Sequence, residues 1–481
     1  MAHPHSITGW DAEDARAWRA GNHAIARRNL LWIIACDHIA FGVWTLWPVL
    51  ALFMPESVYG FSASDKFLLG ATATLVAASL RIPYSLGIAT FGGRNWTVAS
   101  IAVLLVPTGA AAMLLAHPGL PLWPYLVCAA LTGCGGANYA ASMTNTNRFY
   151  PQRLKGSALG LNAGAGNLGV PMIQLVGLLV LATTGHDAPY WVCALYLGLL
   201  IAVGLGAARN MDNLEHATKP GHLRTVLSNA DTWMLALLYL GTFGSWIGFS
   251  FAFGLVLQAN FTAAGQTAVP AALHAAEFAF IGPALGSLAR IYGGRLADRL
   301  GGSRVTLAVF AAMVLATGVL IGVSIATDRH GGHTTPLMVG YVGCFVVLFM
   351  LAGLGNGSVY KMIPSIFEAR SHSLDLGEAE RRRWSQATAG AVIGFVAAFG
   401  ALGGVGINLA LRQSYLSTGT ETAAFWAFVA FYVVAAVLTW ARYVRRPGSA
   451  PRERSKDVRS TQPRLGLAAR VTRGAAAARR R

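Results

Sequence analysis

Two short stretches in opposite halves of the chain, SLRIPYSLG at 79–87 and SLARIYGG at 287–294, resemble each other closely. Each stretch places one arginine, Arg81 or Arg290, inside a long run of apolar residues. An arginine near the middle of a bilayer costs roughly 2.5–3.5 kcal/mol on insertion scales, so such a residue indicates a function. Each stretch also comes shortly before a glycine-rich turn that carries further arginines. The sequence therefore predicts two membrane-embedded halves of related structure, each of which contributes one buried arginine.

The composition of the rest of the chain is that of a membrane protein. Of 481 residues, 54% are hydrophobic and only 12% are charged, whereas soluble domains carry about 25% charged residues. Apolar stretches of about 20 residues can cross a bilayer as helices. We expect twelve such helices in two pseudo-symmetric lobes of six, and hence an all-α membrane protein. The expected spans lie near 29–53, 67–90, 97–115, 122–144, 156–182, 190–208, 231–257, 273–294, 305–326, 337–363, 385–409 and 423–443.

An even number of spans puts both ends of the chain on the same side of the membrane. Nearly all of the lysines and arginines in the expected loops and tails fall on that side. The loops on the opposite side hold only Lys66, Arg329 and Arg412. Because positive residues favour the cytoplasmic side, both termini are predicted to be cytoplasmic. Because the basic residues gather on this side, we attribute the net charge of +17 to the orientation of the chain in the membrane. No nucleic-acid partner is therefore expected.

The longest polar segment between expected spans, 209–230, divides the chain into two lobes at 29–208 and 231–443. This arrangement is typical of a two-lobed carrier whose halves are related by an axis along the membrane normal. Residues 1–28 form a polar N-terminal segment without the apolar region of a cleavable signal peptide. The basic tail at 444–481 has little apolar content, so we expect it to be disordered, cytoplasmic and able to contact anionic lipid.

The two arginines predict an anion as the transported molecule. Pseudo-symmetry places them at similar depth facing one cavity, and neither has an acidic residue within one helical turn. Two guanidiniums about 8 Å apart repel by roughly 2 kcal/mol at an effective dielectric constant of 20, whereas an anion about 4 Å from each gains roughly 4 kcal/mol per arginine. The planar fork of arginine donates two parallel hydrogen bonds, which suits an oxyanion better than the ammonium of lysine does.

The fifth and eleventh expected spans are rich in glycine. They read GLNAGAGNLGVPMIQLVG from Gly160 and AGAVIGFVAAFGALGG from Ala389. Missing side chains let membrane helices approach and slide closely, although packing alone explains most such glycines. Asn167 adds a polar amide that can donate to an anion while its carbonyl bonds elsewhere. The glycines that we assign to helix packing or gating are Gly160, Gly164, Gly166, Gly169, Gly390 and Gly394.

These motifs together resemble those of the nitrate/nitrite porter family of the major facilitator superfamily, along roughly 29–443. The glycine-rich stretches at 160–169 and 389–404 resemble the two nitrate signatures of that family. The surroundings of the two arginines resemble its paired substrate arginines. TFGSWIGFSFAFG at 242–254 and AGLGNGS at 352–358 resemble its seventh and tenth spans. The resemblance implies a carrier that moves nitrate or nitrite by alternating access.

The resemblance also implies a set of substrate-binding residues. Two arginines would clamp the anion, an asparagine would hydrogen-bond it, and three aromatic rings would wall the planar ion from above and below. Tyr239 and Phe243 are four residues apart and so share one helix face, which supports part of this arrangement. Tyr139 departs from the phenylalanine of relatives, and its hydroxyl would add a donor or shift the preference between nitrate and nitrite. The implied residues are Arg81, Arg290, Asn167, Tyr139, Tyr239 and Phe243.

The loop GGRLADRLGGSR, which begins at Gly293, resembles the cytoplasmic gating motif of the superfamily. The resemblance implies that Asp298, close to Arg295 and Arg299, helps to lock the state that is closed toward the cytoplasm. We assign this loop a conformational role and no contact with substrate.

Three further ionisable residues inside the expected spans are candidates for proton coupling. Asp37 and His38 are neighbours in the first span, where an ionisable pair is costly and indicates a function. Lys361 lies near the cytoplasmic end of the tenth span, where it titrates, attracts the anion or extends to the membrane surface. A cavity lined only by two arginines resists closing without an anion and favours exchange, whereas a titratable group permits net uptake with protons. We therefore place nitrate/proton symport slightly ahead of nitrate/nitrite antiport, with another small organic anion as a further alternative.

The sequence carries no metal-ligand cluster, nucleophile motif or phosphate-binding loop, so no enzyme activity, metal or cofactor is expected. The five cysteines fall inside apolar runs without metal-ligand spacing, and we interpret them as small buried residues. The expected partners are nitrate, nitrite, protons and membrane lipid, and the chain is expected to be monomeric. The predicted location is the inner cell membrane, as a multi-pass protein in nitrate assimilation.

Overall fold

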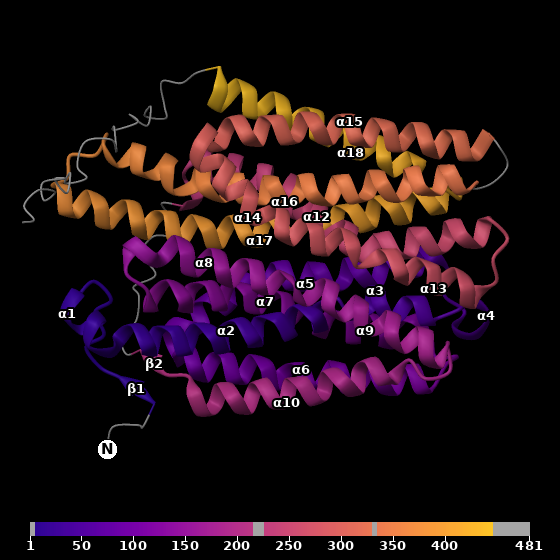
Figure 1. Cartoon of the computed structure of the whole chain (residues 1–481), viewed down its shortest axis with the longest axis horizontal. Coiled ribbons are helices and arrows are strands. Elements are labelled where there is room, and N and C mark those ends of the chain that lie inside the picture. The colour runs from indigo at the N-terminus through magenta and orange to yellow at the C-terminus, as the bar shows by residue number, and fades with distance from the viewer. Residues whose placement is uncertain (1–4, 215–225, 330–333, 446–481) are drawn as a thin grey trace, which may run out of the picture.

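The computed structural model describes residues 5–214, 226–329 and 334–445 and is almost entirely helical (Figure 1). Figure 1 shows the helices of the first half gathered in one layer and those of the second half in another, with their long axes roughly parallel. The strands in the described ranges are two residues each, β1 (Ser6–Ile7) and β2 (Asn213–Leu214). The expected all-α, two-lobed architecture is therefore confirmed.

The first lobe begins with short turns that lead into its long helices. Its helices are α1 (Ala15–Ala17), η1 (Trp18–Asn22), α2 (His23–Trp44), α3 (Leu46–Leu50), η2 (Ala51–Phe53), α4 (Glu56–Tyr59), α5 (Ala63–Phe91), α6 (Gly93–Ala116), α7 (Leu122–Phe149), α8 (Gln152–Asn167), α9 (Gly169–Thr184) and α10 (Tyr190–Asn210).

The second lobe follows the segment at 215–225, which lies outside the described residues. Its helices are α12 (Ala230–Ala263), α13 (Ala268–Ala279), α14 (Ile281–Leu300), α15 (Gly302–Arg329), α16 (Thr335–Ser371), α17 (Glu378–Thr418), α18 (Thr422–Thr439) and η3 (Trp440–Val444).

The helix is interrupted for one residue in three of the expected spans, and two of these, Arg153–Thr184 and Ala268–Leu300, are still single segments long enough to cross a membrane. A proline lacks the backbone N–H and its ring clashes with the carbonyl four residues earlier. Pro48, Pro171 and Pro283 each lie four residues after the last residue of a helix, namely α2, α8 and α13. The break in the first span bends the chain by 48°. The prolines therefore account for the interruptions in the spans at 29–53, 156–182 and 273–294, and the first span is the one that bends sharply.

Ten described helical segments are long and apolar enough to cross a membrane, or eleven if the bent α2/α3 pair is one span. Helix α7 is long enough but is not among them, because it carries polar residues such as Asn138, Ser142 and Asn145. These polar side chains are buried inside the lobe. The chain is thus a multi-pass membrane protein, while the count of twelve spans and the cytoplasmic placement of both termini stay predictions.

The N-terminal segment packs against the end of the first lobe. Strand β1 pairs in parallel with β2, so that Ser6 lies opposite Asn213. Trp10 packs edge-on against Phe149 at the end of α7, with ring centroids 5.4 Å apart. Residues 1–4 and 446–481, which include most of the expected tail, lie outside the described residues. The proposed boundaries of lobes and tails stay as the sequence predicts them.

The two lobes meet mainly along α5 and α17. Phe67 of α5 packs against Tyr415 of α17, with ring centroids 5.5 Å apart. Gln174 of α9 donates a hydrogen bond of 3.1 Å to the carbonyl oxygen of Ser250 in α12. In the predicted orientation these contacts lie on the side of the membrane away from the termini. The lobes are therefore packed together at the end of the molecule away from the termini, and the arginines lie deeper along the same interface.

Candidate functional site

Arg81 lies on α5, a 29-residue helix whose first turn is fixed by a capping box between Ser62 and Asp65. Its side chain is 0% exposed. The Nε atom donates to the carbonyl oxygen of Gly136 on α7 at 3.2 Å, and Nη1 donates to the carbonyl oxygen of Ala397 on α17. Nη2 is buried without a hydrogen-bond partner in the described chain. The N-lobe arginine is thus held by main-chain oxygens and keeps one free donor group.

Aromatic rings surround the Arg81 guanidinium. The Arg81 Cζ atom lies 5.1 Å from the ring centroid of Phe243, 5.3 Å from that of Tyr139 and 5.5 Å from that of Trp44. A guanidinium over an aromatic face is attracted by the negative face of the ring. Trp44 was not predicted as a site residue. The sequence offered one signal for this residue: Trp44 lies four residues before Pro48, at the break in the first span.

Arg290 lies on α14 and is 7% exposed. Its Nη2 atom donates to the hydroxyl oxygens of Tyr139 at 3.2 Å and Tyr239 at 3.3 Å. In the amide orientation that satisfies both ends of Asn167, Oδ1 accepts from Nη1 of Arg290 at 3.1 Å and Nδ2 donates to the carbonyl oxygen of Ala163 at 3.2 Å. Tyr360, which was not predicted, places its ring centroid 5.1 Å from Arg290 Cζ. The C-lobe arginine is thus held by side-chain oxygens.

Each arginine reaches into the opposite lobe. Arg81 of the first lobe bonds to Ala397 and faces Phe243, which both belong to the second. Arg290 of the second lobe bonds to Tyr139 and Asn167 of the first. The structure therefore brings together all six residues that the resemblance implied. Neither arginine forms an ion pair with a carboxylate among the residues described.

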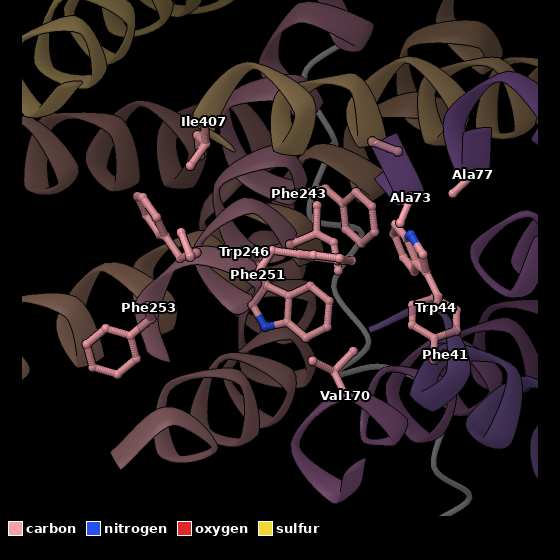
Figure 2. Packing of buried hydrophobic residues seen from close by; sticks show 14 of the residues in the cluster. Phe41, Trp44, Ala73, Ala77, Val170, Phe243, Trp246, Phe251, Phe253 and Ile407 are labelled. Atoms are coloured by element: carbon pink, nitrogen blue, oxygen red, sulfur yellow. The ribbon is translucent and has the colours of Figure 1, made fainter. Parts of the chain in front are cut away.

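The aromatic residues of α12 form one side of this site. The rings of Tyr239 and Phe243 are stacked at 5.2 Å with an interplanar angle of 1°, as their spacing of four residues predicts. Figure 2 shows Phe243 and Trp246 packed in the same buried cluster as Trp44 and Phe41 of α2. Trp44 also lies 6.0 Å from the ring of Phe251. The guanidiniums are therefore set in a tightly packed apolar interior, where electrostatic attraction is stronger than in water.

Asp37 is fully buried on α2, on the N-lobe side of the arginines. It accepts hydrogen bonds from Ser142 Oγ at 3.1 Å and from Asn138 Nδ2 at 3.4 Å, both on α7. It interacts electrostatically with Arg81 without bonding to it directly. The neighbouring His38 is bonded through Nδ1 to the carbonyl oxygen of Ala165 at 3.1 Å. If Nδ1 carries the proton it donates in this bond, so His38 is anchored to α8 while Asp37 faces α7.

Lys361 and Asp298 form an ion pair of 2.6 Å between α16 and α14, with side chains 45% and 52% exposed. The structure thus places Lys361 beside Asp298 near the end of α14 and outside the cluster around the two arginines. Asp298 is thus paired with Lys361 of another helix. Arg295 packs over the ring of Tyr292 at 5.8 Å, and Arg299 is exposed.

The glycines of the two glycine-rich spans fall into two groups. A side chain at Gly166 would come within 2.7 Å of Asp37 Oδ2, and one at Gly169 would overlap the carbonyl of His38. These two glycines let α8 and α9 touch α2. A side chain at Gly160, Gly390 or Gly394 would meet no atom within 4 Å, and one at Gly164 would meet only Ile291, at 3.8 Å.

Comparison with known proteins shows the family to which the chain is similar. The family model described as Major Facilitator Superfamily matches residues 38–405. The chain is 34% identical to the nitrate/nitrite transporter NarU of Salmonella typhimurium, over 92% of this chain and 96% of that protein. It is 29% identical to the probable nitrate/nitrite antiporter NarK2 of Thermus thermophilus, over 92% and 98% of the two chains.

Solved structures support the fold alone, since their sequences are only distantly similar. A mutant of the nucleoside transporter NupG aligns with a TM-score of 0.60 at 13% identity, over 86% of this chain and 99% of that one. A D-xylose-proton symporter aligns with a TM-score of 0.58 at 14% identity, over 86% and 97% of the two chains.

Proposed function

The chain belongs to the nitrate/nitrite porter family of the major facilitator superfamily, and we propose that it carries nitrate and nitrite across the membrane by alternating access. The family consists of transporters, and relatives that cover nearly the full chain are named for nitrate and nitrite. The cargo enters from one side, binds at the interface of the two lobes and leaves when the lobes rock apart on the other side.

The observation that carries this proposal is the pair of buried arginines that reach across the lobe interface. Arg81 keeps a buried Nη2 without a partner in the described chain, and leaving such a donor unsatisfied is costly. An oxyanion between the arginines would accept from this atom and from the Arg290 fork. Because each guanidinium contacts the opposite lobe, an anion bound to both would link the movement of the lobes to its own presence.

We further propose that uptake is coupled to protons through Asp37. This carboxyl group is buried next to the N-lobe arginine and accepts two hydrogen bonds from α7. Gain of a proton by Asp37 would remove a negative charge that interacts with Arg81, and so would strengthen the attraction of Arg81 for an anion. Proton binding and anion binding would then favour each other, which is the requirement for symport.

Nitrate/nitrite antiport is the second candidate. Neither arginine is neutralised by an ion pair with a carboxylate in the described parts of the chain, so closure without an anion would enclose positive charge. A carrier of that kind exchanges one anion for another. The name of the Thermus relative agrees with this mode of transport.

Transport by the purified protein in liposomes distinguishes the candidates. Vesicles are loaded either with nitrite at equal pH or with buffer alone under an inward proton gradient, and nitrate uptake is measured. Symport predicts uptake into the anion-free vesicles that rises with the gradient. Uptake that ignores the gradient and requires internal nitrite would contradict symport and leave antiport.

Formate and acetate serve as competitors for the remaining alternative, a small organic anion. We expect a large excess of either to leave nitrate uptake nearly unchanged. Transport of formate or acetate in preference to nitrate and nitrite would contradict the proposed cargo.

A further inference from the structure

A third tyrosine, Tyr360 of α16, joins Tyr139 and Tyr239 around Arg290. Its ring centroid lies 5.1 Å from Arg290 Cζ and 4.7 Å from the ring centroid of Tyr239. The three tyrosines come from three different helices, α7, α12 and α16, and from both lobes. Their hydroxyl groups therefore meet where the two arginines approach each other.

The position of Tyr360 is fixed by close packing between α16 and α14. A side chain at Gly357 would overlap the carbonyl oxygen of Arg290 and the amide nitrogen of Gly294. The missing side chain lets α16 touch α14 at the level of Arg290 itself. Tyr360 follows Gly357 by three residues and so lies on the same helix face. Its ring is therefore presented to the arginine by a rigid helix–helix contact.

The directions of the hydrogen bonds around Arg290 show which hydroxyl hydrogens remain free to donate. A guanidinium has donors only, so the oxygens of Tyr139 and Tyr239 act as acceptors toward Arg290 Nη2. Each of these hydroxyls retains its own hydrogen for another acceptor. The hydroxyl of Tyr360 is buried near that of Tyr139 but makes no hydrogen bond of good geometry with any residue described.

Although the hydroxyls of Tyr139 and Tyr239 lie close by, no hydrogen bond of good geometry satisfies the Tyr360 hydroxyl within the described ranges, and an oxyanion would supply a better-placed acceptor. We propose, building on the function proposed above, that Tyr360 is an additional anion-binding residue that donates its hydroxyl hydrogen to the transported oxyanion. Nitrate has three acceptor oxygens and nitrite has two. Two oxygens engage the arginines, and Tyr360 donates to the third oxygen of nitrate. Tyr360 therefore determines the preference for nitrate over nitrite.

The test uses the purified full-length protein and its Tyr360→Phe variant, which loses only the hydroxyl. Equilibrium binding of nitrate and of nitrite is measured separately by calorimetry. A hydrogen bond to a charged group changes affinity by roughly 10-fold or more. We expect Tyr360→Phe to weaken nitrate binding by about 10-fold and nitrite binding by at most about 2-fold. The thermal unfolding midpoint without anion should not fall, because the hydroxyl bonds no described residue.

Tyr196→Phe is a matched control. Tyr196 is also buried, and its hydroxyl also lacks a partner in the described chain, but it packs against Gly42 inside the first lobe. This variant should bind both anions as the unmodified protein does. Unchanged nitrate binding in Tyr360→Phe, or an equal loss for both anions, would overturn the assignment. Failure of the unmodified protein to bind either anion would instead refute the proposed function on which the assignment depends.

Discussion

Arg81 and Arg290 occupy equivalent places in the two lobes, yet they are held by different chemistry. Arg81 donates to main-chain carbonyls, lies among the faces of three aromatic rings and has the buried carboxyl group of Asp37 nearby. Arg290 donates to two tyrosine hydroxyls and one amide oxygen. Main-chain carbonyls move only with their helices, whereas hydroxyls rotate.

This difference suits the surroundings of the two arginines to two different tasks. The first lobe holds a rigid cation beside a group that can gain or lose a proton. The second lobe holds a cation whose hydroxyl partners can redirect their hydrogens toward an incoming oxyanion. We infer that the surroundings of Arg81 set the coupling of transport and the surroundings of Arg290 set the recognition of the anion.

The largest effect is expected from loss of the guanidinium fork. Arg81→Lys and Arg290→Lys each keep the charge but lose the planar donors, and a bidentate contact is not replaced by an ammonium. We expect nitrate transport in liposomes to fall by roughly 100-fold in each variant. Arg28→Lys is the control, since Arg28 pairs with Asp212 at 2.6 Å and is about half exposed. Transport near the unmodified rate in either core variant would contradict the clamp.

Asp37→Asn should separate coupling from binding. The substitution keeps the size of the side chain and removes the proton site, so uptake driven by an inward proton gradient should fall by about 10-fold or more, while nitrate/nitrite exchange continues. The sign follows from symport, because only the protonated carboxyl group favours the anion. Gradient-driven uptake that survives in Asp37→Asn would place proton coupling elsewhere or remove it. Asp187→Asn, at an exposed carboxyl group in the bend that follows α9, is the control.

Tyr139→Phe tests the contact that joins the two arginines. Its ring faces Arg81 and its hydroxyl accepts from Arg290, so phenylalanine preserves the first contact and removes the second. We expect nitrate affinity to fall by roughly 5- to 20-fold with little change in the unfolding midpoint. An equal loss in a variant that also removes the ring, Tyr139→Leu, would show that the ring contributes nothing beyond the hydroxyl. Unchanged nitrate affinity in Tyr139→Phe would show that the hydroxyl contributes nothing.

The smallest effect is expected at Lys361. Its ion pair with Asp298 is about half exposed on both sides, and exposed pairs contribute roughly 0–1 kcal/mol. Lys361→Gln should therefore change nitrate transport by no more than about 2-fold, and the response to a proton gradient should remain. Loss of the gradient response in this variant, with Asp37→Asn unaffected, would exchange the roles that we assign to the two residues.

The sequence was informative about the depth and spacing of the site and uninformative about its hydrogen bonds. Repetition around Arg81 and Arg290, and the four-residue spacing of Tyr239 and Phe243, predicted which side chains meet. The helix breaks follow from prolines, yet Pro83, Pro107 and Pro364 lie inside unbroken helices. Local chemistry alone therefore does not decide where a span divides.

Other parts of the site depend on contacts between distant segments. Tyr360 lies beside Arg290 because α16 packs closely on α14. Trp44 is the last residue of α2, where the first span breaks. Lys361 was a candidate for proton coupling because it lies in an apolar span, and its pairing with Asp298 required the arrangement of α14 and α16. A single sequence shows which residues are costly to bury, but not which residues they contact.

The most direct test of the arginine clamp is an experimental structure of the purified protein with bound nitrate. We predict planar density at the lobe interface, with nitrate oxygens at hydrogen-bond distance, about 2.7–2.9 Å, from nitrogens of both Arg81 and Arg290. Nitrate bound elsewhere, with Arg81 still bonded to Gly136 and Ala397 and Arg290 still bonded to its tyrosines, would contradict the clamp.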